Sequence, residues 1–332
     1  MGEITIAKNK YDVLCRMDNL YATYKGNWCL CIPSYTRPNF ALGKYLMEGC
    51  NAEFLKERVF VFVHVEELEA YKSNYPLFNY VIVPEECYGL GRTRDYCYLW
   101  AKEQDYDFAL NFDDDIKALE FLWEDVDAHG FATMRHSTKG DRELFPLLTQ
   151  YILNYYAWSA DQIFKHYPTV RMGAIRRQHF CNNVPPEQFA RINGGSTPRQ
   201  TYAMRLAGYD SSYWSLEESR WHGEDIIGAS HILKDKCEDL FSIQQITYDF
   251  VSESVSSTVR DTDENSPRNI SLHKQEWDNL KSLDLANFVR KSKTYLNGDY
   301  MYGDIDWKAV KADGRITRFH KISTKELEGW LK

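Results

Sequence analysis

Four short, mostly apolar runs in the first third of the chain constrain its fold more than any other feature of the sequence. Each run has four or five residues, too few for a helix, and is apolar enough to be covered on both faces. Amphipathic stretches separate the runs, which is the pattern of strand-helix units around a mainly parallel sheet. The predicted strands are residues 28–32, 59–63, 80–83 and 108–112.

Two amphipathic helices are expected to cover this sheet. The first is predicted at about 92–103, where Tyr96, Leu99 and Trp100 fall at i, i+3 and i+4. The second is predicted at about 141–166 from a longer periodic segment. Both would pack an apolar stripe against the strands.

Shorter elements are expected in the second half of the chain. Residues 185–198 include three prolines and two adjacent glycines, a composition typical of a loop that could move over a site. We also predict a strand at 202–206, a helix at 224–234, a strand at 241–248 and a polar loop at 252–269.

These elements predict one main α/β domain, a mixed sheet flanked by helices, with a helical insert and a C-terminal appendage. Its 332 residues suffice for a sizeable core. The expected parts are an N-terminal extension at 1–26, a main domain at 27–255 and a loop with the appendage at 256–332. Within the main domain we expect a donor half at 27–120, the insert at about 141–167 and an acceptor half at about 168–255.

Charge and hydropathy limit the class of partner. The net charge is −8, so the whole molecule does not attract nucleic acid, although local basic clusters remain. They are Arg171 with Arg176, Arg177, Gln178 and His179, then Arg191 with Arg199, and the segment 308–321. No window reaches the ~20 apolar residues of a membrane span, and residues 1–10 lack a signal-peptide core. We therefore expect a cytoplasmic protein that does not bind a membrane, in the host cytoplasm if it is viral.

The eight cysteines show no paired CxxC spacing, which argues against a zinc ribbon or a disulfide framework. Cys29 and Cys31 alternate along a predicted strand and should share one face. Buried free cysteine behaves there as a small hydrophobe.

An acidic triplet, Asp113, Asp114 and Asp115, directly follows the fourth predicted strand. In open parallel sheets, ligands bind beyond the carboxyl ends of the strands. Three adjacent carboxylates repel one another unless a cation or donors compensate, and hard divalent metals favour carboxylate and phosphate oxygens. The alternative is a solvated turn in which one aspartate caps a helix starting near Ile116.

Two other segments are candidates to act with the triplet. Tyr88 to Asp95 reads Tyr-Gly-Leu-Gly-Arg-Thr-Arg-Asp and starts a helix, where free backbone N–H groups favour an anion and Arg92 and Arg94 add planar donors. Glu224 and Asp225 follow a glycine at a second predicted helix start. Taken alone, the first could be a tight turn and the second an ordinary pair of capping acids.

In order and spacing, these motifs resemble the GT-A superfamily of nucleotide-sugar glycosyltransferases. The matching features are the Pro33-Ser34-Tyr35 turn, the Gly-Leu-Gly-Arg-Thr-Arg-Asp helix start, Asp-x-Asp at 113–115, Gly194-Gly195, Gly208-Tyr209-Asp210 and Gly223-Glu224-Asp225. They span roughly residues 27 to 250. The resemblance implies a Rossmann-like GT-A fold, a UDP-sugar donor and Mn²⁺ or Mg²⁺.

The resemblance also implies residue roles. Asp115 would hold the metal, Asp113 would contact the ribose or the metal shell, and Asp225 would be the catalytic base with Glu224 ordering the acceptor. Relatives often carry a late histidine ligand, for which His222, His231 and His273 are candidates, and His64-Val65-Glu66 stands where many relatives have an acidic turn. The candidate residues are Pro33, Ser34, Tyr35, Arg37, Gly91, Arg92, Arg94, Asp113 and Asp114 for the donor, Asp115, Asp113 and His273 for the metal, and Asp225 and Glu224 for catalysis.

A base acting on the acceptor hydroxyl fits single displacement, so we expect inversion at the anomeric carbon. The Ser34, Arg37-Pro38, Gly-Leu-Gly-Arg-x-Arg-Asp and Phe-Asp-Asp-Asp-Ile motifs look like those of viral and kinetoplastid transferases that glycosylate 5-hydroxymethylpyrimidines in DNA. That resemblance implies an extruded hydroxymethyl base, such as 5-hydroxymethylcytosine, as the acceptor.

Other functions remain open at this point. The acceptor could be a glycan or a lipid-linked saccharide. A sugar-phosphate nucleotidyltransferase would carry its glycine-rich loop after the first strand, and a phosphohydrolase would not need the arginine-bearing helix start. A non-catalytic nucleic-acid-binding module with a degenerate transferase fold is the alternative outside the enzymes. The sequence leaves the sugar and the oligomeric state undetermined.

Overall fold

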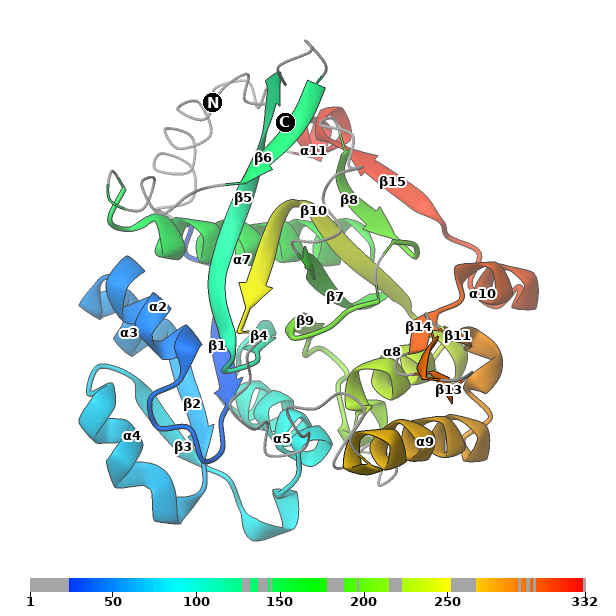
Figure 1. Cartoon of the computed structure of the whole chain (residues 1–332). Helices are drawn as coiled ribbons and strands as arrows, with labels where there is room; N and C mark the ends of the chain where they lie inside the picture. Colours follow the sequence, from blue (N-terminus) through cyan, green and yellow to red (C-terminus); the bar gives the residue numbers. More distant parts are fainter. Residues whose placement is uncertain are drawn as a thin grey trace.

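A central mixed sheet with helices on both faces organises the computed structural model (Figure 1). The structure describes residues 24–126, 132–136, 143, 145–177, 188–195, 197–214, 223–251, 267–291, 294–296, 299–300 and 303–330. The main sheet runs in the order β15-β8-β10-β7-β9-β4-β1-β2-β3, and β5 pairs with β10 and β6. The predicted mixed sheet flanked by helices is confirmed.

The donor half contains three parallel strand pairs. β1 pairs with β2 and β4, and β2 pairs with β3, all in parallel. The elements of this half are β1 (Trp28–Pro33), α2 (Ala41–Gly49), α3 (Ala52–Arg58), β2 (Val59–Val63), α4 (Leu68–Asn74), β3 (Asn79–Ile82), α5 (Leu90–Glu103) and β4 (Phe108–Phe112). The four predicted strands are confirmed, with the third beginning and ending one residue earlier than expected.

The next part of the chain adds antiparallel pairings. β9 pairs antiparallel with both β4 and β7, and β10 pairs in parallel with β7. The elements are β5 (Ile116–Val126), β6 (Ala132–His136), α7 (Leu148–His166), β7 (Val170–Arg177), β8 (Gln188–Ile192), β9 (Thr201–Arg205), α8 (Glu224–Lys234) and β10 (Asp239–Phe250). Because β9 reverses direction between β4 and β7, the strands β1, β4 and β7 run the same way and end at one edge of the sheet.

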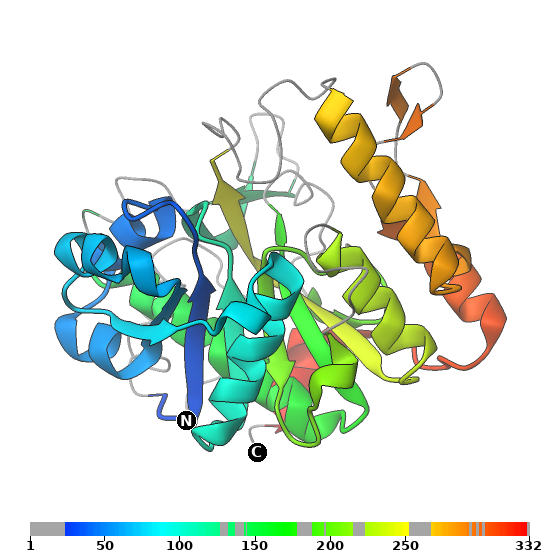
Figure 2. The same ribbon diagram turned by 90° about the horizontal axis from the view of Figure 1, so that it is seen from below.

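The described elements between residues 267 and 313 form a smaller group beside the sheet (Figure 2). The strand β15, which follows this group, pairs antiparallel with β8 and so extends the main sheet. The elements from residue 267 onwards are α9 (Pro267–Ser282), β11 (Val289–Lys291), β12 (Thr294–Leu296), β13 (Asp299–Tyr300), β14 (Gly303–Ile305), α10 (Trp307–Asp313), β15 (His320–Ser323) and α11 (Thr324–Trp330). The C-terminal residues thus contribute a strand to the main sheet.

Two hydrophobic clusters cover opposite faces of the sheet. One contains Trp28, Leu30 and Ile32 of β1 with residues of α2, α3 and α7. The other contains Cys29 and Cys31 with residues of α5 and α8. Side chains alternate across a strand, so one run of six residues serves both clusters. Cys29 and Cys31 are buried and free, as predicted.

Three local predictions were wrong. Ile116 begins the strand β5 rather than a helix, so no aspartate of the triplet caps a helix there. The predicted loop at 185–198 contains β8, a buried strand that pairs with β10 on one side and with β15 on the other. The long helix predicted from about residue 141 is α7, which begins at Leu148 because Pro146 lies in a turn before it. In the described helices, no segment is long and apolar enough to span a bilayer.

Candidate active site

The acidic triplet lies between β4 and β5, at the edge of the sheet where β1, β4 and β7 end. Because β1 and β4 are adjacent and parallel, the Pro33-Ser34-Tyr35 turn after β1 lies beside the triplet. The backbone N–H of Asp113 donates to the carbonyl of Gln200, which precedes β9. The surroundings of the triplet are therefore assembled from segments next to three strands, β1, β4 and β9.

Asp114 faces the turn after β1. Its Oδ2 accepts a hydrogen bond of 2.6 Å from the Ser34 hydroxyl, and its Oδ1 accepts one of 2.6 Å from Nη1 of Arg37. The hydroxyl of Tyr71 on α4 lies 2.8 Å from Ser34 Oγ and accepts from the Arg37 N–H. Burial raises the pKa of the Asp114 carboxyl, although Arg37 and Ser34 oppose this. Three of the predicted donor residues thus form one network.

Arg94 of α5 joins the two predicted carboxylate clusters. Its guanidinium is fully buried, donates to Asn111 Oδ1 at 2.6 Å and to Asp113 Oδ1, and lies 3.4 Å from Oε1 of Glu224. It also lies over the ring of Tyr202, 4.9 Å from its centroid. Burial alone would lower the pKa of Arg94, but the carboxylates outweigh it and raise the pKa well above its ordinary value. Arg94 therefore remains charged and links α5, β4 and α8.

Asp115 is the member of the triplet with the most perturbed acidity. Burial, followed by the charges of Asp113 and Asp114, raises its pKa to about 8. Its Oδ1 accepts one long hydrogen bond of 3.3 Å, from Nε2 of Gln200. A carboxylate that is costly to ionise beside two others is compensated by a cation, so this part of the site fits a divalent metal.

The protein ligands for such a metal are few. In the part of the chain that the structure describes, no group of three His, Cys, Asp or Glu side chains converges on one metal position. His231 lies in the last turn of α8 and pairs with Asp235, whereas Glu224 is in the first turn. His273 is on α9, but its side chain, like the whole of His222, is outside the described residues. Proteins usually bind Mg²⁺ through one or two carboxylates together with substrate phosphates, so Asp113 and Asp115 are the candidates to hold it.

The acidity of Asp115 predicts how pH affects the metal-free protein. A carboxyl whose pKa is 3.8 unfolded and about 8 folded adds stability below pH 4, which is lost as pH rises through 8. We expect the melting temperature in EDTA to fall by a few degrees between pH 5 and pH 8. Differential scanning fluorimetry should show that Mn²⁺ reverses the loss at pH 8 and that Asp115→Asn removes most of the pH dependence. An equal slope in Asp115→Asn would contradict this assignment.

The second predicted cluster begins α8. Gly223 adopts φ +75°, and a Cβ there would lie 2.8 Å from Glu276 Cγ, so this helix start requires glycine. Glu224 is buried, whereas the Asp225 carboxylate is partly exposed. The N–H of Ile226 donates to Asp225 Oδ1 at 2.8 Å, and Arg199 Nε lies 3.6 Å from Oδ2.

An aromatic stack follows the ends of β1, β2 and β3. The rings of His64 and Tyr88 are parallel, with centroids 3.5 Å apart, and the Tyr35 ring lies 4.4 Å from His64. Burial lowers the pKa of His64, although the nearby Glu66 opposes this. The lowered pKa favours the neutral ring. Tyr35 is 45% exposed, so the stack has an open face. In the sequence, Tyr35, His64 and Tyr88 all lie in turns already indicated as parts of the site, but nothing there showed that their rings meet.

The helix start after Tyr88 has the expected backbone. Gly89 adopts φ +109° and Gly91 is buried, so the chain turns sharply into α5. The guanidinium of Arg92 donates to the carbonyl of Glu86 at 2.9 Å. Arg92 is only partly buried, unlike Arg94, which lies further along the helix.

Gln200 and Arg199 are site residues that the sequence analysis did not single out for this role. Both directly precede β9, which runs antiparallel to β4. The first residue of an antiparallel neighbour lies beside the last residue of its partner, so residues just before β9 must lie near the triplet. The sequence showed that both residues precede a predicted strand. It did not show that this strand runs antiparallel to β4, which is what brings them to the triplet.

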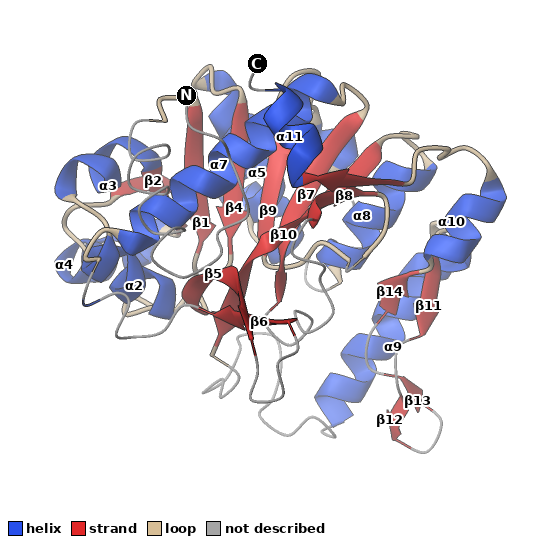
Figure 3. Ribbon diagram, turned by 90° about the horizontal axis from the view of Figure 1, so that it is seen from above, coloured by secondary structure: helices blue, strands red, loops and turns tan. Residues whose placement is uncertain are grey.

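The predicted basic clusters are mostly engaged in internal contacts. Arg171 pairs with Glu238 through Nε at 2.7 Å, and Arg176 donates to Gln244 at 2.9 Å. Gln178 and His179 are outside the described residues, as is the side chain of Arg177. In Figures 1 and 3, α8 lies between β4 and the helix α10, which contains Lys308 and Lys311.

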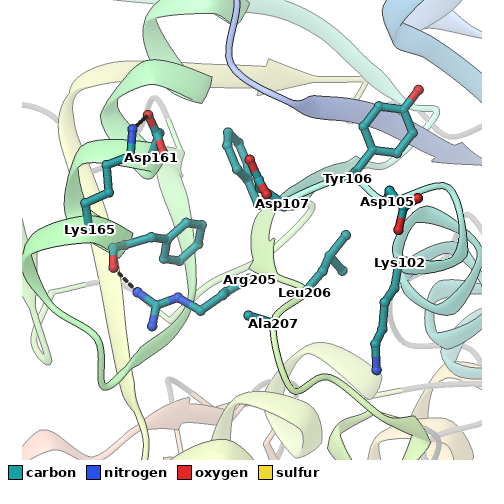
Figure 4. Close-up of a pocket in the computed structure, with 11 residues that line it drawn as sticks. Lys102, Asp105, Tyr106, Asp107, Asp161, Lys165, Arg205, Leu206 and Ala207 are labelled. Atoms are coloured by element: carbon teal, nitrogen blue, oxygen red, sulfur yellow. Dashed lines mark hydrogen bonds and ion pairs between the residues drawn. The ribbon is translucent and has the colours of Figure 1, made fainter.

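A cavity of about 610 Å³ lies at the opposite edge of the sheet (Figure 4). Its lining includes Asp107 and Phe108, at the start of β4, whereas the triplet follows the end of that strand. Its charged groups are largely paired: Lys165 with Asp161 at 2.6 Å, and Arg205 with carbonyls that include Tyr167 at 3.1 Å. This cavity is separate from the candidate active site.

The acidic residues at the carboxyl ends of the strands lie where α/β enzymes bind their substrates. The sequence profile described as TET-Associated Glycosyltransferase matches residues 30–226, more than half of the chain. The chain belongs to this family, and it is an enzyme. No curated protein sequence matches the chain.

Solved structures with a similar arrangement include glucosyl-3-phosphoglycerate synthase from Mycobacterium tuberculosis. In complex with Mn²⁺, uridine-diphosphate-glucose and phosphoglyceric acid, it is 9% identical over 90% of this chain and 95% of that chain, with a TM-score of 0.41. Its complex with phosphoglyceric acid is 10% identical over 79% of this chain and 83% of that chain, with a TM-score of 0.43. Mannose-1-phosphate geranyltransferase from Thermus thermophilus is 9% identical over 67% of this chain and 76% of that chain, with a TM-score of 0.35. Such distant similarity carries no information about ligands.

Proposed function

We propose that this protein transfers a sugar from a UDP-sugar to a hydroxyl group of a modified pyrimidine in DNA, with a divalent metal and with inversion. The observation that carries this proposal is the Arg94 bridge. It brings Asp113, which follows β4, to Glu224, which begins α8 more than a hundred residues later. A site with one carboxylate cluster for a metal diphosphate and another for a proton acceptor suits glycosyl transfer.

On the donor side, the aromatic stack gives the nucleobase a surface. Tyr35 offers an exposed ring beside His64 and Tyr88, and flat rings favour offset stacking with a base. Asp115 and Asp113 would hold the metal at the adjacent end of β4. When bound, Mn²⁺ or Mg²⁺ would supply Lewis-acid stabilisation of the leaving diphosphate.

The contacts suggest a division of labour among the predicted donor residues. Asp114 and Arg37 neutralise each other and fasten the turn after β1, so they shape the nucleoside site rather than bind phosphate. Arg94 is fully buried and paired with carboxylates, so it positions Asp113 and Glu224. Arg92, which is only partly buried at the helix start, is the better placed arginine for a phosphate.

On the acceptor side, Asp225 is the proposed general base. Its carboxylate is held by Ile226 N–H and is partly exposed, whereas Glu224 is buried against Arg94. A base that takes the proton of an attacking hydroxyl fits single displacement and inversion. Proton NMR of the first-formed product tests this: an anomeric configuration equal to that of the donor would exclude inversion.

DNA is the proposed acceptor because of the resemblance in the Ser34, Arg37-Pro38 and Phe-Asp-Asp-Asp-Ile motifs and the family's association with TET. A glycan or lipid-linked saccharide is the rival acceptor. Counterion release makes DNA affinity fall steeply with salt. Fluorescence anisotropy with a duplex carrying 5-hydroxymethylcytosine should show that fall, and salt-independent binding would count against a DNA acceptor.

The decisive experiment offers the protein a panel of UDP-sugars, Mn²⁺ and the same duplex, followed by mass spectrometry of the nucleosides. We expect one hexose or pentose mass added to the hydroxymethylated nucleoside, and no addition with EDTA. An unmodified duplex is the control. Transfer to members of a glycan panel, but not to the duplex, would show that the acceptor is a glycan. Failure to bind or hydrolyse any UDP-sugar would favour a non-catalytic binding module.

A further inference from the structure

The short loop between β8 and β9 holds an arginine that reaches both the proposed base and the C-terminal segment. Arg199 lies in this loop with its side chain 24% exposed. Its Nε is 3.6 Å from Asp225 Oδ2, and its Nη2 is 3.6 Å from Oδ1 of Asp304 on β14. Nη2 also donates to the carbonyl of Gly303. One side chain thus connects α8 with β14.

Two further contacts fasten the same loop to the same strand. The backbone N–H of Ile305 donates to Thr197 Oγ1 at 2.9 Å. The indole N–H of Trp307, which follows β14 closely, donates to the Gly195 carbonyl at 2.9 Å. The loop and residues 303–307 are therefore held together at three places, of which Arg199 is the one that also reaches Asp225.

The charges around Arg199 are arranged to keep it in place. Burial alone would lower the pKa of its guanidinium, but the charges of Asp225, Asp304 and Glu276 outweigh this and raise it above the ordinary value. Glu276 of α9 is buried, and its Oε1 would lie 3.7 Å from a Cβ at Gly303. Arg199 therefore lies among carboxylates that come from α8, β14 and α9.

We propose that Arg199 is a positioning residue, held by Asp304 of the C-terminal segment, that fixes the orientation of the Asp225 carboxylate for proton transfer. This inference rests on the proposed function, in which Asp225 is the base. One carboxylate oxygen is held by Ile226 N–H and the other faces Arg199, so the rotation of the carboxylate is restrained at both oxygens. The C-terminal segment then contributes to the geometry of the acceptor half.

The test compares Arg199→Met, Arg199→Lys and Asp304→Asn in the full chain, with UDP-glucose, Mn²⁺ and the duplex carrying 5-hydroxymethylcytosine. A misplaced catalytic group costs up to about 100-fold in rate, so we expect Arg199→Met to lower kcat by about 10- to 100-fold. The KM for UDP-glucose and its metal-dependent hydrolysis should stay within about twofold of the parental values, because the contacts of Arg199 described above are with α8 and β14. Arg199→Lys should recover part of kcat, and Asp304→Asn should lower kcat less.

The control is Asp313→Asn, since Asp313 is another carboxylate of the C-terminal segment and pairs with Arg315 instead. Its kcat should equal the parental value. A parental kcat in Arg199→Met, or a fall in hydrolysis and melting temperature that parallels the fall in transfer, would overturn the positioning role. If Asp225→Asn is inactive in the same assay, such a result leaves the proposed function standing. If the parental protein neither transfers nor hydrolyses UDP-sugar, both proposals fail together.

Discussion

Asp225→Asn is expected to lower kcat for sugar transfer by about 10²- to 10⁴-fold, the range attributable to a general base. The amide keeps the size of the side chain and can still accept the Ile226 N–H bond, so the start of α8 should be preserved. Binding of UDP-sugar should be unchanged, because the donor half lies across the Arg94 bridge. Initial-rate kinetics and isothermal titration with UDP-glucose measure the two quantities separately.

The control for this substitution is Asp235→Asn. Asp235 lies at the other end of α8, where it pairs with His231 at 2.6 Å. We expect this variant to transfer at the parental rate. Parental transfer by Asp225→Asn itself would show that the base assignment is wrong, and a weaker affinity for the donor would show that Asp225 belongs to the donor site.

Arg94→Met is expected to cause the largest loss of stability among single substitutions in the site. It leaves Asp113 and Glu224 without their shared cation, and breaking a buried ion pair in this way costs about 3–5 kcal/mol. Because the Asp113 carboxylate is 21% exposed and partly screened by solvent, we expect about 3 kcal/mol, near the lower end. Urea unfolding followed by circular dichroism measures this change, and transfer should also be lost.

A second substitution separates charge from packing. In the double variant Arg94→Met with Glu224→Gln, the uncompensated charge at α8 is removed, so part of the free energy of unfolding should return while activity does not. Arg92→Met is the matched control for stability, since Arg92 is on the same helix start but is less buried. If Arg94→Met unfolds at the parental urea concentration, the bridge does not hold the two halves together.

The bridge also explains why the triplet does not act as three equivalent ligands. Asp114 is turned toward Ser34 and Arg37, Asp113 toward Arg94, and Asp115 toward Gln200. These different partners separate Asp114 from the other two. The middle residue therefore fixes the neighbouring turn, and Asp113 and Asp115 are the proposed metal ligands.

The sequence by itself determined the strands β1, β2 and β4, the helix α8 and the position of the acidic triplet after β4. These features depend on local signals: an uninterrupted apolar run, a period of 3.6 residues, or a glycine before two acids. The same signals located Asp113, Asp115, Glu224 and Asp225 as candidates. A buried strand occupies consecutive positions of the sequence, so no knowledge of its neighbours is needed to find it.

Only the tertiary structure decided which of these residues meet. The strand β8 was predicted as loop because of the prolines and glycines around it, whereas it forms by pairing with β10 and β15 from elsewhere in the chain. The Arg94 link to Glu224, the contact of Arg199 with Asp304 and the stack of Tyr88 on His64 join separate elements. Such contacts depend on the order and direction of the strands in the sheet. Local periodicity does not encode that order, because it arises from the packing of distant segments against one another.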